Sequence, residues 1–262
     1  VKAKDSEKVK VSGGVQYEGD CSFDCSLFAD SVRGKREDLS VEGDLSVERS
    51  IRIYEGGLSV GGSLTAKKVE VDERISVEKN LSAESIEVGG SVKIGGNTTA
   101  KEIDVGGSFE AHGNVEAENI EAGGSARVEG ATTGLKINVG GTFHGKGKVE
   151  VRTIDVGGTL TIESEVIAEG LDVGGTARVS GGDVRNKINV GGSLESSRPL
   201  TFGSIDVGGR VELAGLCKGG RIAVGGTLKI EGDLKFTDID VGGVCKIQGD
   251  LQFGFRQRLK AD

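Results

Sequence analysis

A Gly-Gly pair returns along this chain at a fixed interval, and this regularity constrains the fold more than any other feature. The first glycines of the pairs, each 17 residues after the last, are Gly89, Gly106, Gly123, Gly140, Gly157, Gly174, Gly191, Gly208, Gly225 and Gly242. A constant period of this kind is typical of a solenoid, in which each repeat packs on its two neighbours.

Each repeat also contains three pairs of apolar or small residues, and the two members of a pair are two residues apart. Side chains of a strand alternate between its faces, so this spacing places both members on one buried face. Three such pairs predict three short strands per repeat. In one repeat the residues predicted to be buried are Ile154, Val156, Leu160, Ile162 and Val166.

Glycine occupies the positions between these strands, where the chain has to turn. The Gly-Gly pairs form one column, and single glycines such as Gly96, Gly113 and Gly130 form a second. Glycine reaches positive φ without a steric penalty. We therefore expect at least one glycine of a pair, such as Gly157 or Gly158, to adopt a positive φ.

The pattern continues toward the N-terminus with looser spacing. Apolar pairs recur from Val9/Val11 to Leu45/Val47, but the pair expected near residues 33–35 is missing. The charged sequence VRGKRED at residues 32–38 predicts a bulge or loop there.

Together these features predict an all-β fold, a single-stranded, three-sided parallel β-helix of about fourteen turns with about 17–18 residues each. Spacings of six, six and five residues between strands favour the right-handed form, because left-handed β-helices keep a strict hexapeptide. We expect an N-terminal tail at 1–8, the solenoid at 9–253 and a C-terminal tail at 254–262. Residues 9–50 are less regular and are a candidate N-terminal cap.

Composition argues against several classes of partner. With 33 basic and 41 acidic residues the net charge is −8, whereas a nucleic-acid scaffold needs a basic surface. No apolar run is long enough for a transmembrane helix, and no signal peptide or membrane-targeting segment is evident. The four cysteines, interpreted as small buried side chains, fit a reducing compartment and hence a cytoplasmic location: Cys21, Cys25, Cys217 and Cys245.

Residues able to carry chemistry are few and scattered. His112 and His144 fall two turns apart at different positions of the repeat, and no long loop after residue 51 provides the wall of a groove. We therefore predict a non-enzymatic protein with no catalytic, cofactor-binding or metal site.

One outward column of carboxylates follows the repeat, two residues before the Gly-Gly corner. Its members include Asp104, Glu121, Asp155, Asp172, Asp206 and Asp240, called here the acidic stripe. The stripe is a candidate face for a basic partner or cations. The alternative is a solvated surface that discourages aggregation.

Two repeat sequences, IDVGGTLTIESEV and LKIEGDLKFTDIDVGG, resemble those of the bactofilins, a family of polymer-forming cytoskeletal proteins. The resemblance covers roughly residues 40–253. It implies a right-handed, three-sided β-helix that assembles end to end into non-polar filaments without nucleotide. Members of the family usually have a shorter helix and flexible, proline-containing tails.

The leading hypothesis is a structural scaffold that associates with itself through the ends of the β-helix. At the N-terminus, Phe23, Leu27 and Phe28 are available as a cap, so the C-terminal end is expected to be the more adhesive one. Its candidate contact residues are Leu251, Phe253 and Phe255. The alternative is a monomeric or discretely oligomeric β-helix that displays the acidic stripe to a partner.

Overall fold

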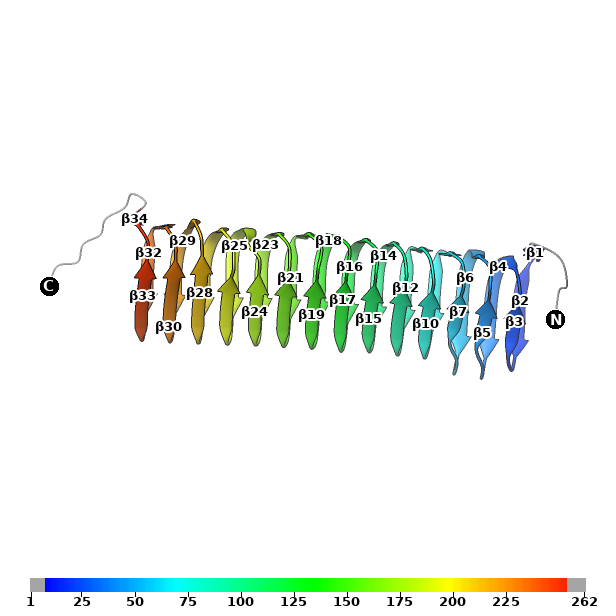
Figure 1. The fold of residues 1–262 in the computed structure, drawn as a ribbon. Coiled ribbons are helices and arrows are strands. Elements are labelled where there is room, and N and C mark those ends of the chain that lie inside the picture. Colours follow the sequence, from blue (N-terminus) through cyan, green and yellow to red (C-terminus); the bar gives the residue numbers. More distant parts are fainter. Residues whose placement is uncertain (1–7, 254–262) are drawn as a thin grey trace. The chain divides into compact units, whose positions relative to one another are not determined.

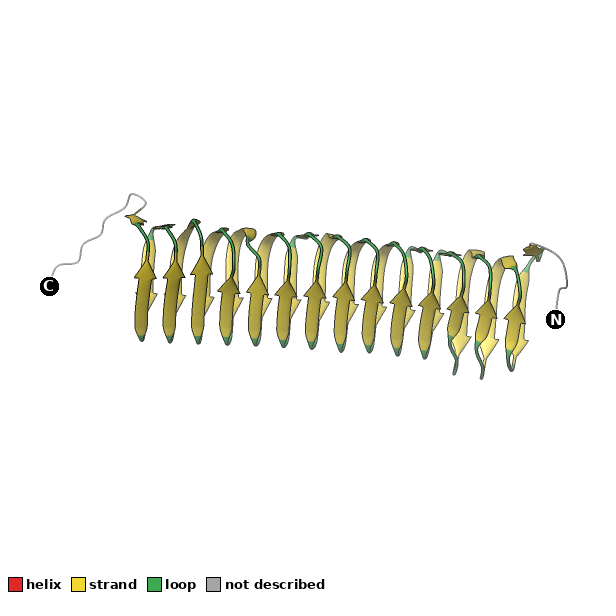
Figure 2. Ribbon diagram, in the orientation of Figure 1, coloured by secondary structure: helices red, strands yellow, loops and turns green. Residues whose placement is uncertain are grey.

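The computed structural model describes residues 8–253, and all the regular secondary structure of this part is β-strand (Figure 2). The chain divides into two compact units, residues 1–141 and 142–262. In each unit the strands are parallel, and each strand pairs with the strand one turn further along the chain.

Unit 1 contains two sheets, whose successive strands are stacked side by side (Figure 1). Its first sheet holds β1 (Lys8–Lys10), β2 (Gly14–Glu18), β4 (Ser26–Lys35), β6 (Leu45–Tyr54), β8 (Leu64–Thr65), β9 (Lys68–Val71), β11 (Leu81–Ser82), β12 (Ser85–Val88), β14 (Thr98–Val105), β16 (Val115–Ala122) and β18 (Thr132–Val139). Its second sheet holds β3 (Cys21–Phe23), β5 (Leu39–Val41), β7 (Leu58–Val60), β10 (Arg74–Val77), β13 (Ser91–Ile94), β15 (Ser108–Ala111) and β17 (Ser125–Val128).

Unit 2 repeats this arrangement. Its first sheet holds β20 (Val149–Glu150), β21 (Thr153–Val156), β23 (Val166–Val173), β25 (Gly182–Val190), β27 (Leu200–Val207), β29 (Cys217–Val224), β31 (Leu234–Phe236), β32 (Asp238–Val241) and β34 (Leu251–Phe253). Its second sheet holds β19 (Thr142–Gly145), β22 (Thr159–Ile162), β24 (Thr176–Val179), β26 (Ser193–Ser196), β28 (Arg210–Ala214), β30 (Thr227–Glu231) and β33 (Val244–Gln248).

The strand register stacks equivalent residues of successive repeats on one another. In unit 1, Ile86 pairs with Ile103, and Ile103 pairs with Ile120. The second sheet contributes one strand per turn and seven strands in each unit, so the predicted parallel β-solenoid of about fourteen turns is confirmed. The five residues predicted to be buried between Ile154 and Val166 are each at most 1% exposed, which confirms the inward face of the repeat.

The Gly-Gly corner is explained by close backbone stacking, and the expectation of positive φ there was wrong. Within residues 8–253, the positive-φ glycines include none of the ten pairs. Instead, a Cβ added at Gly107 would lie 2.5 Å from the carbonyl oxygen of Gly90, one turn earlier. No real Cβ tolerates that distance, so the corner excludes side chains because the next turn lies directly against it.

The second glycine column has two different origins. In unit 2, Gly232 and Gly249 have φ of 135° and 147°, which a residue with a side chain rarely adopts. In unit 1, Gly96 lacks a positive φ, but an added Cβ would lie 2.5 Å from the Oδ1 of Asn80. That oxygen accepts the backbone N–H of Asn97 at 2.9 Å, and the same contact recurs one turn later. A ladder of asparagine side chains therefore closes this corner.

Residues 32–35 belong to strand β4, so the bulge or loop predicted at residues 32–38 was wrong for these four residues. Strand β4 continues to Lys35, and Gly34 pairs with Ile53 as the inward residue of its turn. An apolar side chain is missing there because a Cβ at Gly34 would overlap the ring of Tyr17. Tyr17 thus fills the space that a larger residue at position 34 would occupy.

Placing a carboxylate on the inward face should disrupt unit 2. We expect Leu160→Asp to lower the free energy of unfolding by at least about 3 kcal/mol, because Leu160 is fully buried and a carboxylate there has no partner. Thr161→Asp is the matched control, since Thr161 is the neighbouring outward residue and pairs with Arg178. Thermal melts that are equal for the two variants would contradict the inward assignment.

The corner glycines should resist substitution in spite of their ordinary φ. We expect Gly107→Ala to cost about 1–3 kcal/mol through overpacking. At Gly170, which also lacks a positive φ, the nearest atoms to an added Cβ lie 4.0 Å away. Gly170→Ala should be neutral or stabilising by a few tenths of a kcal/mol or more. The comparison is made by chemical denaturation of both variants, and equal effects would refute the stacking explanation.

Candidate functional site

Both histidines have a carboxylate within hydrogen-bonding distance. His112 Nε2 lies 3.0 Å from Glu110 Oε1, and His144 Nε2 lies 2.6 Å from Glu163 Oε1. In residues 8–253, no group of three or more His, Cys, Asp and Glu side chains is arranged to hold a metal ion. The histidines therefore do not contribute to a metal-ligand cluster in this part of the chain.

The acidic stripe follows the strand register in both units. In unit 1, Asp104 pairs with Glu121 across β14 and β16. In unit 2, Asp155 pairs with Asp172 across β21 and β23. These residues are exposed, apart from the half-buried Glu121, so consecutive carboxylates lie about one strand spacing, 4.8 Å, apart.

Half of the stripe carboxylates have a cationic neighbour from the same chain. Glu121 lies 3.9 Å from the ammonium of Lys136, Asp206 lies 3.3 Å from Lys187 and Asp240 lies 3.6 Å from Arg221. Asp172 accepts a hydrogen bond of 3.1 Å from the amide of Asn189. Asp104 and Asp155 have no ion pair within the described residues.

A signal for this neutralisation is present in the sequence. Where the repeat replaces the stripe carboxylate by another residue, at Asn138, Asn189 and Ala223, a basic residue stands two positions earlier. Those basic residues are Lys136, Lys187 and Arg221, which are the ones that reach the carboxylates of adjacent turns.

The C-terminal turn of unit 2 exposes residues that are buried elsewhere in the repeat. Leu251 and Phe253 are 40% and 73% exposed, whereas Leu234 and Phe236, their partners one turn earlier, are 1% and 3% exposed. The ring centroids of Phe236 and Phe253 are 4.6 Å apart, so one face of Phe253 is packed. Phe255, the third predicted contact residue, lies outside the described residues.

Sequence reasoning missed one further apolar residue at this end. Val244 is 51% exposed and occupies an outward position of β33. The earlier residue in register with it is Thr227, a member of a Ser/Thr column in which Val244 is the apolar exception and Arg210 a charged one. That apolar exception is the signal by which Val244 could have been found.

The last strands have no following strand among the described residues, which leaves part of their backbone groups without a partner there. Among the described residues, β32, β33 and β34 pair only with the preceding turn, through β29, β30 and β31. Such an edge of N–H and C=O groups beside exposed apolar side chains is suited to strand addition.

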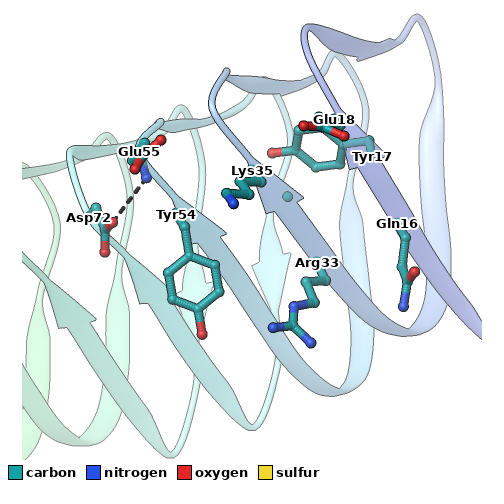
Figure 3. A pocket seen from close by; sticks show the side chains of 9 residues that line it. Gln16, Tyr17, Glu18, Arg33, Lys35, Tyr54, Glu55 and Asp72 are labelled. Atoms are coloured by element: carbon teal, nitrogen blue, oxygen red, sulfur yellow. Dashed lines mark hydrogen bonds between the residues drawn. The ribbon is translucent and has the colours of Figure 1, made fainter.

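The N-terminal end of unit 1 is less exposed than the C-terminal end of unit 2. The predicted capping residues Phe23 and Leu27 are 8% and 0% exposed and belong to the first two turns, while Phe28 is half-buried on the outward side of β4. Beside this end lies a groove of about 660 Å³ whose lining includes Arg33, Lys35 and Tyr54 (Figure 3).

Residues 36–133 match the model of the bactofilin family, which is described as polymer-forming cytoskeletal. Comparison with curated proteins and with solved structures gives no match. Among the described residues, no helix is long and apolar enough to cross a membrane.

The reactivity of the cysteines should report the exposure of the last turn. The interpretation of the four cysteines as buried side chains was wrong for Cys245, which is exposed on the last described turn. Cys217 is buried, and burial raises the pKa of its thiol. We expect a disulfide reagent to modify Cys245 at least about a hundredfold faster than Cys217, because only an accessible thiolate reacts. The Cys245→Ser variant should lose the fast phase.

The comparison is made in a chain whose half-buried Cys21 is replaced by serine. A Cys245 that reacts there as slowly as Cys217 would show that the last turn is covered.

Proposed function

We propose that this chain, in which residues 36–133 form a bactofilin domain, is a structural subunit that associates with other copies through the C-terminal end of unit 2, without nucleotide. The bactofilin family is polymer-forming and cytoskeletal, which implies a structural role and no enzymatic activity. The same description supports a cytoplasmic location.

The observation that carries the proposal is the exposed apolar last turn. Val244, Leu251 and Phe253 are among the few large apolar side chains of the described residues that are substantially exposed. They lie on adjacent strands of one turn, beside an edge of backbone groups that have no following strand within the described residues. Apolar contact and strand pairing can therefore act at the same place.

The magnitudes indicate that both contributions are needed. Full burial of a side chain of this size stabilises by about 1.5–3 kcal/mol, and these three are already partly buried. Two copies would thus gain roughly 6–10 kcal/mol from their apolar residues, which is comparable with an association cost of about 4–15 kcal/mol. Backbone hydrogen bonds between the two last turns supply the remaining stabilisation.

A two-fold axis is the arrangement that satisfies both copies equally. The same patch then faces itself, so each residue in the contact is used twice. The last strands of the two copies would run antiparallel, which allows a ladder of short, perpendicular hydrogen bonds. Contacts of this kind join C-terminal ends in pairs, so an assembly built from them has no polarity.

The alternative function, display of the acidic stripe to a partner, has weaker support. Four of its six carboxylates lie within 4 Å of a cation or amide of their own chain. Three of these four contacts are ion pairs, so half of the stripe carboxylates already have a counter-charge before a partner binds. Asp104 and Asp155 are the two carboxylates without a cationic or amide neighbour among the described residues.

Substitution of Phe253 tests the proposed end contact. We expect Phe253→Asp to weaken self-association by at least about a hundredfold, because it removes an apolar contact and places two carboxylates against each other. The size of the full chain is followed by light scattering and sedimentation over a range of concentrations. Truncation after Gly254 is measured in parallel and separates the contribution of the last turn from that of residues 255–262.

Gln252→Asp is the matched control, since it adds the same charge on an exposed outward position of the same strand. It should leave association within about threefold of the parent chain, because it does not lie on the apolar contact. The proposal fails if Phe253→Asp keeps its fold and associates as strongly as the parent chain. It also fails if the parent chain stays monomeric at high concentration.

A further inference from the structure

One face of unit 1 carries opposite charges at its two ends. In this unit the outward column that contains the stripe starts at the uncharged Gln16. Its charged members are then Arg33, Arg52, Glu70, Glu87, Asp104 and Glu121. Each residue pairs in register with the next, so the side chains are spaced about one strand, 4.8 Å, apart. We call this surface the dipolar face.

The flanking side chains strengthen the asymmetry. Residues 31–35 and 50–54 carry three basic side chains and no acidic one: Arg33, Lys35 and Arg52. The equivalent segments at residues 85–89, 102–106 and 119–123 carry four acidic side chains and no basic one: Glu87, Glu102, Asp104 and Glu121. The basic and acidic ends are separated by the turn that contains Glu70.

Some charges at each end of the face have no ion pair among the described residues, whereas Arg52, Glu87 and Glu121 do have one. Arg33 is exposed and lies over the ring of Tyr54, with 5.9 Å between its guanidinium carbon and the ring centroid (Figure 3). Neither Arg33 nor Lys35 has an ion pair within residues 8–253, and the same is true of Glu102 and Asp104.

In the middle, Glu70 contacts both Arg52 and Lys68, and Lys68 also lies 3.5 Å from Glu87. Arg52 and Glu87 are thus already paired within the chain, so Arg33 and Asp104 are the residues of the column with charge left for a partner.

We propose that the dipolar face is a lateral contact with a second copy of this chain, turned antiparallel about a two-fold axis through Glu70. This axis places Arg33 opposite Asp104 of the second copy and Arg52 opposite Glu87. Each pairing occurs twice, and the equal spacing of the turns keeps all four in register. The two copies of Glu70 meet near the axis, where Arg52 and Lys68 of each chain already neutralise them.

The chain itself fits this face better than an external partner of one charge. A basic partner would match only residues 87–121, and an acidic partner only residues 33–52. A parallel copy shifted by three turns pairs Arg33 with Glu87 and Arg52 with Asp104, but it places Glu70 against Glu121. The antiparallel copy avoids that repulsion and is a closed, isologous contact.

The test uses the full chain carrying Phe253→Asp, so that association through the C-terminal end does not obscure a lateral contact. We expect sedimentation velocity to reveal a dimer that weakens at least about tenfold between about 50 mM and 500 mM salt, because exposed ion pairs are screened. Arg33→Glu and Asp104→Lys should each weaken this dimer at least about tenfold, since each reverses two of the four pairings. Combining Arg33→Glu with Asp104→Lys should restore association to within about threefold of the Phe253→Asp chain.

Two further variants define the geometry. Arg33→Glu combined with Glu87→Lys should restore association less well than the combination with Asp104→Lys, and the reverse order would overturn the antiparallel arrangement. Asp155→Lys is the control, because Asp155 occupies the same column in unit 2, is exposed and lacks an ion pair among the described residues. It should have no effect.

The proposal is overturned if the Phe253→Asp chain forms no salt-sensitive dimer. It is also overturned if adding Arg33→Glu leaves association as strong as in the Phe253→Asp chain. It is also overturned if the double charge swap is as weak as the single variants. These outcomes do not depend on the end contact. Even where Phe253→Asp leaves association through the C-terminal end unchanged, the lateral contact is measured as the salt-sensitive part of the association, which the charge swap alters.

Discussion

The structure depends on direct stacking of one backbone turn on the next. Because every strand pairs with the strand one turn away, each N–H and C=O group of an interior turn is satisfied by its neighbours. The spacing between turns is then fixed at about 4.8 Å along every column of residues. Glycine is required where the turns touch at a corner, as at Gly107. At the second corner, the side chain of Asn97 also accepts a backbone N–H of the next turn.

This constraint explains how much the sequence could predict. The inward pairs are determined by alternation within a strand, so residues such as Leu160 were placed correctly from the sequence alone. The reason for the corner glycines was not accessible, because the atom that excludes a side chain belongs to a residue one turn away. Gly34 is the clearest case: its lack of a side chain is explained by the ring of Tyr17, and it resembles a break in the pattern when read alone.

The same distinction applies to the candidate site. Leu251 and Phe253 were found because a solenoid has a last turn, and their position in the repeat identifies them as inward residues. Val244 was missed because it is outward, and it becomes visible only as an exception in a hydroxyl column. The pairing of the stripe carboxylates with Lys136, Lys187 and Arg221 was also missed, since each contact crosses between turns.

Interior turns of a periodic solenoid are nearly equivalent, so a specific contact needs residues that break the period. Val244 does so at the last turn, and Arg33 and Arg52 do so in a column that is otherwise acidic or neutral. The two sets differ in physical character. The end contact is apolar and should persist at high salt, whereas the dipolar face is held by exposed charges that salt screens. The two proposed contacts are therefore expected to respond differently to ionic strength, which should weaken the lateral contact and spare the end contact.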